Sequence, residues 1–325
     1  MFNLFKLVRG GNLLLIAATQ YLVRFCIIAP ILRIKGLDLQ MSELWFAMLV
    51  LATVLLAAGG YAINDYFDTK TDAINRPSRV LVGKGLSRKF AIKLHFLLST
   101  VGSILGIATS VYVGVWQYAL IFPLVGGLLW FYSTTYKGQL VIGNLIIAFM
   151  AGMVPLLVLM FEYGKITHTL LDALLINGVN LNAITYWVLG FAVFAFVTTL
   201  IREVVKDMED FNGDIQTGRT TIPIAWGANA AKAIVVILTL LEALAVYWVF
   251  FTFLYILPSD RVDWISMIYI TATIVVPLLV LAVRVVLAST ASHYRFASLL
   301  VKLVMVFGVL YTLIFNIVLK QVYLF

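Results

Sequence analysis

The chain has 325 residues, of which 63% are hydrophobic and only 12% charged, and its mean hydropathy is +1.04. Soluble domains carry about 25% charged residues, so this composition excludes an ordinary soluble globular protein. The single cysteine, Cys26, excludes an intrachain disulfide and a cysteine-rich metal site. A net charge of +8 is compatible with nucleic-acid binding, but in a membrane protein it reports topology, so no nucleic-acid partner is expected.

Apolar runs long enough to cross a hydrocarbon core of about 30 Å recur along the whole chain. In chain order they predict nine membrane-spanning helices, at residues 12–32, 43–63, 90–112, 116–133, 140–161, 183–203, 231–257, 264–287 and 293–319. Backbone groups in hydrocarbon must be hydrogen-bonded within the protein, so each span is a helix. The predicted fold class is therefore all-α, with residues 1–325 forming a single polytopic membrane domain.

The distribution of basic residues predicts the orientation of these helices. If the N-terminus is cytoplasmic, most Lys and Arg residues fall in cytoplasmic segments, as the positive-inside rule requires. Two basic residues, Arg24 and Lys302, instead lie within apolar runs. Each of them either extends its charge to the membrane interface or faces a functional site.

Two acidic segments fall on the predicted cytoplasmic face. "NDYFDTKTDAINRPSR" (residues 64–79) follows the second helix, and "REVVKDMEDFNGD" (residues 202–214) follows the sixth. If each helix continues into its segment, the acids of each lie on one face, where repulsion between like charges calls for a cation. The positive-inside rule accounts for Lys and Arg residues in cytoplasmic segments, but it does not explain why acidic residues gather here. The two segments share one spacing, Asp65-x2-Asp68-x3-Asp72 and Asp207-x2-Asp210-x3-Asp214.

Carboxylates and an amide oxygen, with no His or Cys nearby, are ligands that suit Mg²⁺. This ion is usually bound by a few carboxylates together with the phosphates of a substrate. Several basic or phenolic side chains surround the acidic segments and suit a polyphosphate. They are Arg76, Arg79, Tyr132, Lys137, Lys206 and Arg219. The sequence thus predicts a cytoplasmic Mg²⁺–diphosphate site built from residues 64–79 and 202–219.

A diphosphate site beside an apolar bundle indicates a lipid diphosphate as substrate. Its prenyl tail can lie among the helices, while Mg²⁺ and basic side chains stabilise the charge that forms as the carbon–oxygen bond breaks. The allylic carbocation is then captured by a nucleophile on a second substrate, in a cavity that excludes water. When the nucleophile is a hydroxyl group, Glu203 or Asp207 is available to accept its proton.

These segments resemble the UbiA superfamily of intramembrane prenyltransferases, and the resemblance covers essentially the whole chain. Its first motif, N-D-x-x-D-x-x-x-D, is matched by Asn64, Asp65, Asp68 and Asp72, and its second, D-x-x-x-D, by Asp210 and Asp214. The resemblance implies catalytic roles for Asp68, Asp72, Asp210, Asp214 and Lys137. It also implies that Asn64 and the four aspartates hold Mg²⁺, with Asp65 and Asp207 as additional or outer ligands.

Within the superfamily, three stretches are most similar to the geranylgeranylglycerol-phosphate geranylgeranyltransferase branch. They are "NDYFDTKTDAINRPSR", "YSTTYKGQLVIGN", which ends at Asn144, and "REVVKDMEDFNGDIQTGRTTIPI". The branch implies a lipid-phosphate acceptor, and Arg76, Arg79, Tyr132, Asn144, Lys206 and Arg219 are expected to bind substrate. The sequence departs from the branch after the first motif, where Arg79-Val80 and "VLVGKG" replace the usual Arg-Pro and Pro-Ser-Gly.

Two other functions remain open at this point. An aromatic quinone precursor, dihydroxynaphthoate or hydroxybenzoate, would use the same donor chemistry, and the metal motifs do not separate it from the lipid phosphate. A secondary transporter would carry its charged residues near the bilayer midplane on interrupted helices, whereas here the acids gather at one face. The expected partners are the donor, the acceptor and the bilayer, with no obligate protein partner.

Overall fold

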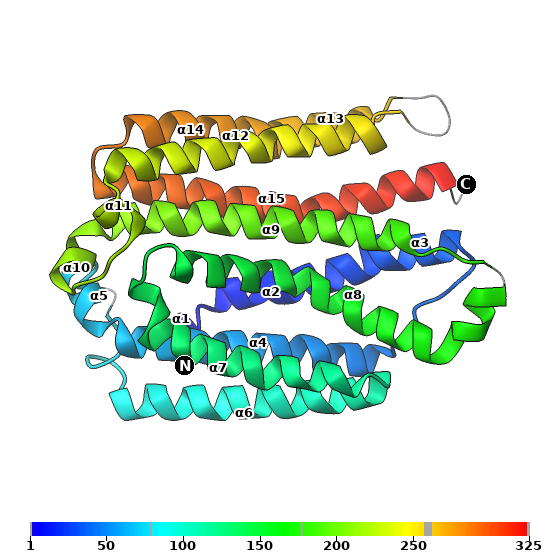
Figure 1. Ribbon diagram of the computed structural model, residues 1–325, viewed down its shortest axis with the longest axis horizontal. Coiled ribbons are helices and arrows are strands. Elements are labelled where there is room, and N and C mark those ends of the chain that lie inside the picture. The colour runs from blue at the N-terminus through cyan, green and yellow to red at the C-terminus, as the bar shows by residue number, and fades with distance from the viewer. Residues whose placement is uncertain (1, 79, 177, 257–261, 324–325) are drawn as a thin grey trace.

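The computed structural model describes residues 2–78, 80–176, 178–256 and 262–323. Within these ranges the chain is an all-helical bundle without a β-strand, as the apolar pattern predicts. The long helices lie side by side with similar directions (Figure 1). The protein is therefore an integral membrane protein of helical type, because only such helices satisfy their own backbone groups in lipid.

The first half of the bundle is formed by the elements before residue 140. They are α1 (Phe2–Leu7), α2 (Gly10–Leu22), the π-helix η1 (Val23–Ile28), α3 (Ala29–Ile34), α4 (Glu43–Phe67), α5 (Thr69–Asn75), α6 (Arg88–Val113), the short η2 (Trp116–Leu120), α7 (Ile121–Thr134) and η3 (Tyr136–Gly138). The segments α2, η1 and α3 together make the first predicted span.

The second half contains the two longest helices. Its elements are α8 (Ile142–Ile176), α9 (Asn182–Glu209), α10 (Phe211–Gln216), α11 (Ile222–Ala225), α12 (Ala228–Phe253), α13 (Trp264–Ile270), the π-helix η4 (Thr271–Val275), α14 (Val276–Leu287) and α15 (Ala291–Tyr323). The prediction that the fifth span ends at residue 161 is wrong, because α8 continues through the buried Glu162.

Eight helices of the described residues are long and apolar enough to cross a membrane. The remaining predicted span, residues 116–133, corresponds to η2 and α7. At 1.5 Å per residue, the fourteen residues of α7 cover about 21 Å. Although α7 is short, η2 and α7 together lead from the end of α6 back to the end of the bundle where the acidic segments lie. There Lys137 contacts Asp68 at the end of α4. The number of nine crossings stays a prediction.

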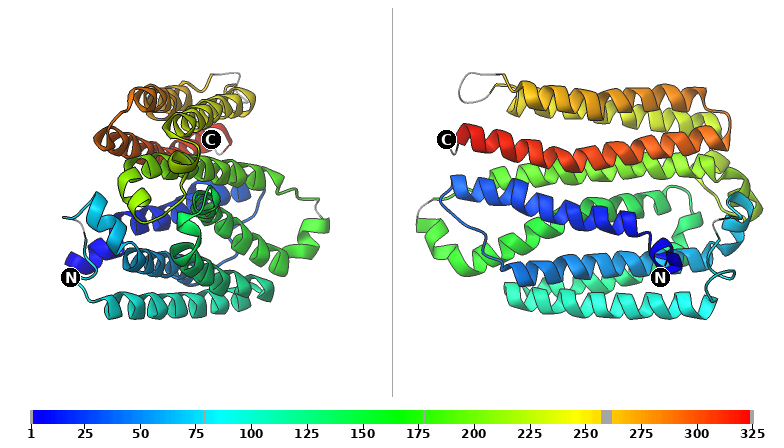
Figure 2. Two further views of the ribbon diagram at one scale, coloured as in Figure 1. Left: turned by 60° about the vertical axis from the view of Figure 1, so that its left-hand side comes forward. Right: turned by 180° about the vertical axis from the view of Figure 1, so that it is seen from behind.

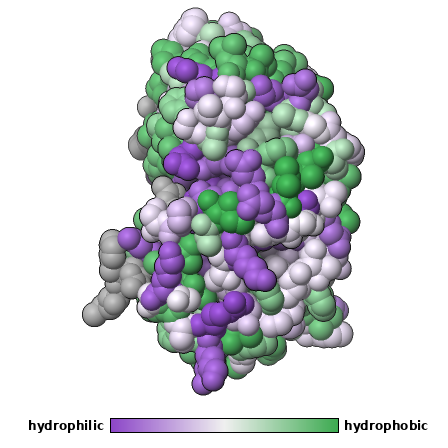
Figure 3. All heavy atoms as spheres, turned by 90° about the vertical axis from the view of Figure 1, so that its left-hand side faces the viewer, coloured by the Kyte–Doolittle hydropathy of each residue, from purple (hydrophilic) through white to green (hydrophobic). Residues whose placement is uncertain are grey.

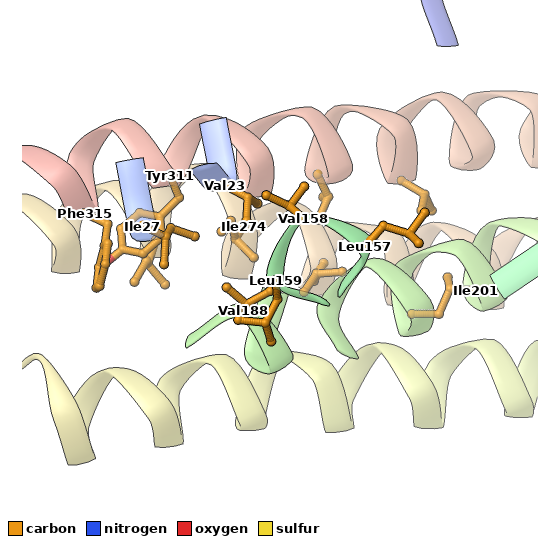
Figure 4. Packing of buried hydrophobic residues seen from close by; sticks show 14 of the residues in the cluster. Val23, Ile27, Leu157, Val158, Leu159, Val188, Ile201, Ile274, Tyr311 and Phe315 are labelled. Atoms are coloured by element: carbon orange, nitrogen blue, oxygen red, sulfur yellow. The ribbon is translucent and has the colours of Figure 1, made fainter. Parts of the chain in front are cut away.

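The helices pack in layers around a continuous apolar core. The helix α6 lies at one side of the bundle and α12 and α14 at the other, with α4, α2, α8, α9 and α15 between them (Figure 2). Side chains from η1, α8, α9 and α15 meet in the interior, among them Ile27, Val158, Val188 and Phe315 (Figure 4). The polar ends of α4 and α9 are thereby held at the same end of the bundle.

The far end of the bundle is held by a buried charged group. Arg24 in η1 is fully buried and lies 3.5 Å from a carboxylate oxygen of Glu162 and 3.2 Å from one of Glu43. Glu162 also accepts hydrogen bonds from the backbone N–H groups of Gln40 (2.6 Å) and Met41 (3.1 Å). Arg24 therefore does not face the acidic segments. It joins the first span to α8.

Candidate active site

Both acidic segments break their helices at the same position. Asp68 separates α4 from α5 with φ −80° and ψ −3°, and Asp210 separates α9 from α10 with φ −92° and ψ 5°. The expectation that each set of acids follows one continuous helix is therefore wrong. These turn conformations lie at the edge of the helical region and are accessible to any residue. They let the short helices α5 and α10 leave the helix axes and pack against each other.

The packing of α5 on α10 depends on one asparagine. Asn75 donates its side-chain N–H to the Asp210 carbonyl oxygen (3.0 Å) and accepts from the Gly213 N–H (3.0 Å). A Cβ atom at residue 213 would lie 2.5 Å from the Asn75 amide nitrogen, so any residue other than glycine would displace this side chain. Thr71 and Thr217 add a hydroxyl hydrogen bond of 3.2 Å. The two acidic segments are thus joined by direct contacts at one end of the bundle, where hydrophilic side chains gather (Figure 3).

Asp68 is the centre of the site. It is 4% exposed, and its carboxylate accepts hydrogen bonds from Lys137 and, at 2.5 Å, from Arg219. Asn64 donates to the same carboxylate at 2.7 Å and accepts from Lys137 at 2.8 Å. The other nitrogen of the Arg219 fork lies 3.2 Å from the carboxylate of Asp214. One guanidinium therefore links the first acidic motif to the second.

The pKa values of these acids follow from burial and from their cationic neighbours. Burial alone would raise the pKa of Asp68, but the charges of Lys137 and Arg219 outweigh it and lower the pKa to about 2. For Asp214, burial prevails over the single partner Arg219 and raises the pKa to about 6. Burial likewise raises the pKa of Asp72 and of Asp210.

The other predicted metal ligands have partners of their own. Asp65 pairs with Arg9 (3.1 Å), and Asp210 pairs with Arg76 (2.8 Å). Asp72 is half-buried, and its carboxylate makes no hydrogen bond or ion pair with any residue that the structure describes. Asp207 accepts a hydrogen bond of 2.8 Å from the amide of Asn144.

Apart from Asn144, which binds Asp207, the predicted substrate-binding residues divide into three groups. Tyr132, Lys137 and Lys206 line a cavity beside the acidic site, and Lys206 pairs there with Glu203 at 3.1 Å. The side chains of Arg76 and Arg219 lie among the aspartates instead. Arg79 lies outside the described residues.

The cavity has a volume of about 520 Å³ and extends from the acidic site into the bundle. Its polar end includes Asn64 and Lys137, which both contact Asp68, and most of its remaining wall is apolar. Three basic residues of the wall, Arg9, Arg202 and Lys302, were not among the predicted substrate-binding residues. Arg202 begins the second acidic segment, and for Lys302, which the sequence left open, the structure shows a side chain that faces the cavity. In the sequence, Arg9 resembles a basic residue that only sets membrane orientation, because it precedes the first apolar run. Its place at the site becomes evident only from tertiary contacts such as its pairing with Asp65.

The donor set fits Mg²⁺ by its chemistry, since the motif residues offer only carboxylate and amide oxygens. In the described residues, however, no three His, Cys, Asp or Glu side chains are placed to share one ion. Arg219 and Lys137 occupy the carboxylate oxygens of Asp68 instead. Asp68 and Asp214 would be able to hold a divalent ion only if Arg219 turned away from them, and a diphosphate would offer the guanidinium another partner.

Comparison with known families identifies this arrangement. The model of the UbiA prenyltransferase family matches residues 37–306, which include both acidic motifs and the polar end of the cavity. The chain belongs to the UbiA prenyltransferase family. It is therefore a prenyltransferase, and the resemblance noted from the motifs is confirmed.

Relatives of this UbiA family member include digeranylgeranylglyceryl phosphate synthases. The one of Thermococcus kodakarensis is 32% identical over 225 residues, which are 68% of this chain and 72% of the relative. The one of Methanobrevibacter smithii is 30% identical over 237 residues, or 73% of this chain and 74% of the relative.

Solved structures confirm the UbiA fold. A digeranylgeranylglyceryl phosphate synthase structure has a TM-score of 0.61 at 21% identity and covers 97% of this chain and 98% of that chain. A UbiA homologue from Archaeoglobus fulgidus, bound to GPP and Mg²⁺, has a TM-score of 0.55 at 15% identity and covers 94% and 98%.

Proposed function

We propose that this prenyltransferase transfers a prenyl group from a prenyl diphosphate to geranylgeranylglycerol phosphate, in a Mg²⁺-dependent reaction that forms an ether bond. The curated relatives with this activity support the acceptor, and the Archaeoglobus fulgidus homologue bound to GPP and Mg²⁺ supports the donor and the metal. The observation that carries the proposal is the link from Asp68 through Arg219 to Asp214 at the polar end of an apolar cavity.

The acidic motifs are the proposed binding site for the donor head group. Asn64, Asp68, Asp72, Asp210 and Asp214 would hold Mg²⁺, with Asp65 and Asp207 outside them. The metal, when bound, neutralises charge on the leaving diphosphate. Lys137 and Arg219 turn from Asp68 to the diphosphate oxygens and stabilise the negative charge that develops there. As the carbon–oxygen bond breaks, its electron pair leaves with the diphosphate, and the apolar wall keeps water from the carbocation.

The acceptor completes the reaction through its hydroxyl group. The hydroxyl oxygen forms the new bond to the allylic carbon and loses its proton. Of the two acids considered for this proton, Glu203 lines the cavity, whereas Asp207 does not and is bound to Asn144. Of these two acids, Glu203 is therefore the one that a hydroxyl in the cavity can reach, although Arg202 and Lys206 hold its carboxylate in this structure. The positive-inside distribution of basic residues supports a cytoplasmic position for the site.

Product identification tests the proposal. Purified protein in detergent is incubated with Mg²⁺, geranylgeranyl diphosphate and either geranylgeranylglycerol phosphate or dihydroxynaphthoate, and products are identified by mass. We expect a prenylated glycerol phosphate that disappears with EDTA and in Asp68→Asn. Asp38→Asn is the matched control, because this exposed acid lies far from the site. A prenylated naphthoate as the only product would instead assign the chain to quinone synthesis, and no product from either acceptor would overturn the proposal.

A further inference from the structure

A second group of cations lines the cavity outside the acidic motifs. Arg9 precedes α2, Arg202 and Lys206 lie one turn apart on α9, and Lys302 lies on α15. We call these four residues the basic wall. They come from three parts of the chain that are far apart in sequence, and all four border the same cavity as Lys137 and Asn64.

The basic wall carries more charge than its acidic neighbours neutralise. Arg9 pairs with Asp65, while Arg202 and Lys206 share the single carboxylate of Glu203, each at 3.1 Å. Lys302 has no acidic partner among the described residues and donates only to the amide oxygen of Asn12 (2.9 Å). The four cations are thus ion-paired with only two acids, and Lys302 has no ion-pair partner among the described residues.

Unused hydrogen-bonding groups lie beside this charge. The hydroxyl of Thr199 borders the cavity, is 4% exposed and has no hydrogen-bond partner. The Nε atom of Arg202, one turn further along α9, is also buried without a partner. Buried polar groups without partners are costly, and an uncompensated buried charge costs more. The wall is therefore incomplete without an anionic ligand.

The Mg²⁺–diphosphate site does not account for this excess. There, Lys137 and Arg219 balance Asp68 and Asp214, and any bound Mg²⁺ brings its own charge to the donor diphosphate. A phosphate monoester carries about −1.5 to −2 charges at pH 7 and accepts several hydrogen bonds, which matches the wall in charge and in donors. An aromatic carboxylate carries a single charge and matches it less well.

We propose that the basic wall binds the phosphate monoester of the acceptor lipid, so that acceptor phosphate and donor diphosphate occupy separate parts of one cavity. This inference rests on the proposed function and adds the residues that select a phosphorylated acceptor. The hydroxyl of the acceptor then lies between the wall and the acidic site, with Glu203 beside it.

Steady-state kinetics with two acceptors test the wall. The variant Lys302→Gln is compared with wild type on geranylgeranylglycerol phosphate and on geranylgeranylglycerol, which lacks the phosphate. We expect KM for the phosphorylated acceptor to rise about tenfold or more, as for a lost charged hydrogen bond, with little change for the neutral acceptor or the donor. Lys302→Arg should restore most of the affinity. Lys93→Gln, which removes an exposed lysine of α6, is the matched control.

Two kinetic outcomes would overturn the proposal. A selective rise in KM for the donor would assign the wall to the diphosphate, and equal losses on both acceptors would assign Lys302 a structural role. Binding of dodecyl phosphate, measured by calorimetry without donor, separates this inference from the proposed function. If wild type fails to prenylate geranylgeranylglycerol phosphate, binding that is weakened in Lys302→Gln still supports a phosphate site. Binding that is equal in both proteins contradicts it.

Discussion

At the scale of single residues, Asp68 and Asp214 show how position decides the charge state of a carboxylate. Both are buried and both contact Arg219. Asp68 has Lys137 as a second cationic partner, and its pKa falls to about 2, whereas the pKa of Asp214 rises to about 6. Without metal, Asp68 therefore stabilises the folded protein in its charged form, while charged Asp214 is destabilising.

Asp214→Asn should stabilise the metal-free protein while it removes activity. The folded-state pKa of Asp214 is above its ordinary value of 3.8, so folding becomes less favourable as the pH rises from about 4 to about 6. Asparagine does not titrate, and the variant should gain up to about 3 kcal/mol above this window. Melting temperatures in detergent from pH 4 to pH 8 measure this difference.

The same substitution separates stability from function. Activity of Asp214→Asn at pH 7.5 should fall by about two orders of magnitude, as when one group that stabilises the transition state is lost. Added Mg²⁺ and donor should raise the melting temperature of wild type more than that of the variant. A variant that melts below wild type at pH 7.5 without metal would contradict the cost assigned to charged Asp214.

At the scale of elements, the contact of α5 with α10 aligns the two acidic motifs. Gly213→Ala places a methyl group against Asn75 and should separate the short helices without removing a proposed ligand. We expect a loss of activity of at least tenfold and a weaker response to Mg²⁺ in thermal melts. Gly190→Ala on α9 is the control, because nothing lies within 4 Å of its new methyl group. Full activity in Gly213→Ala would show that this contact does not position the motifs.

The far end of the bundle offers the opposite test, of stability without catalysis. Glu162→Leu leaves the fully buried Arg24 without its buried partner and should cost about 3–5 kcal/mol of stability. The double variant Arg24→Met, Glu162→Leu should recover part of that loss, whereas Arg33→Gln, which breaks an exposed pair, should change it by less than about 1 kcal/mol. If the melting temperature of Glu162→Leu equals that of wild type, the Arg24–Glu162 pair does not stabilise the fold.

At the scale of the whole molecule, patterns that are local in sequence predicted more than patterns that depend on tertiary contacts. The apolar runs predicted the helical membrane fold, and the repeated aspartate spacing predicted two segments that the structure joins through Arg219. The helix break at Asp68 has no local signal, and in the second segment Asn212 and Gly213 indicate an early helix end without fixing the break at Asp210. Arg24 pairs with Glu162, and Lys302 donates a hydrogen bond to Asn12. Both contacts join residues that are far apart in the chain, and a single sequence does not reveal such contacts.

Cysteine labelling can test the orientation of the protein in the membrane and the number of its membrane crossings. Cys26 is the single cysteine and is buried, so background labelling should be low. Single cysteines replacing exposed Lys84, Lys35 and Lys320 can be labelled with an impermeant maleimide in intact cells. Lys84 belongs to the segment that follows α5 at the site end, whereas α15 begins beside Glu209 at that end and finishes at the opposite one (Figure 1).

With a cytoplasmic N-terminus and nine crossings, Lys35→Cys and Lys320→Cys should react in intact cells, and Lys84→Cys only after the membrane is permeabilised. The physical reason is the excess of basic residues at the site end, which the positive-inside rule keeps in the cytoplasm. Labelling of Lys84→Cys from outside would reverse the orientation. Labelling of Lys84→Cys and Lys320→Cys from the same side would mean that α7 does not cross, although its end contacts Asp68. If all three cysteines label as expected, the diphosphate site lies on the cytoplasmic side, and soluble diphosphate is released there.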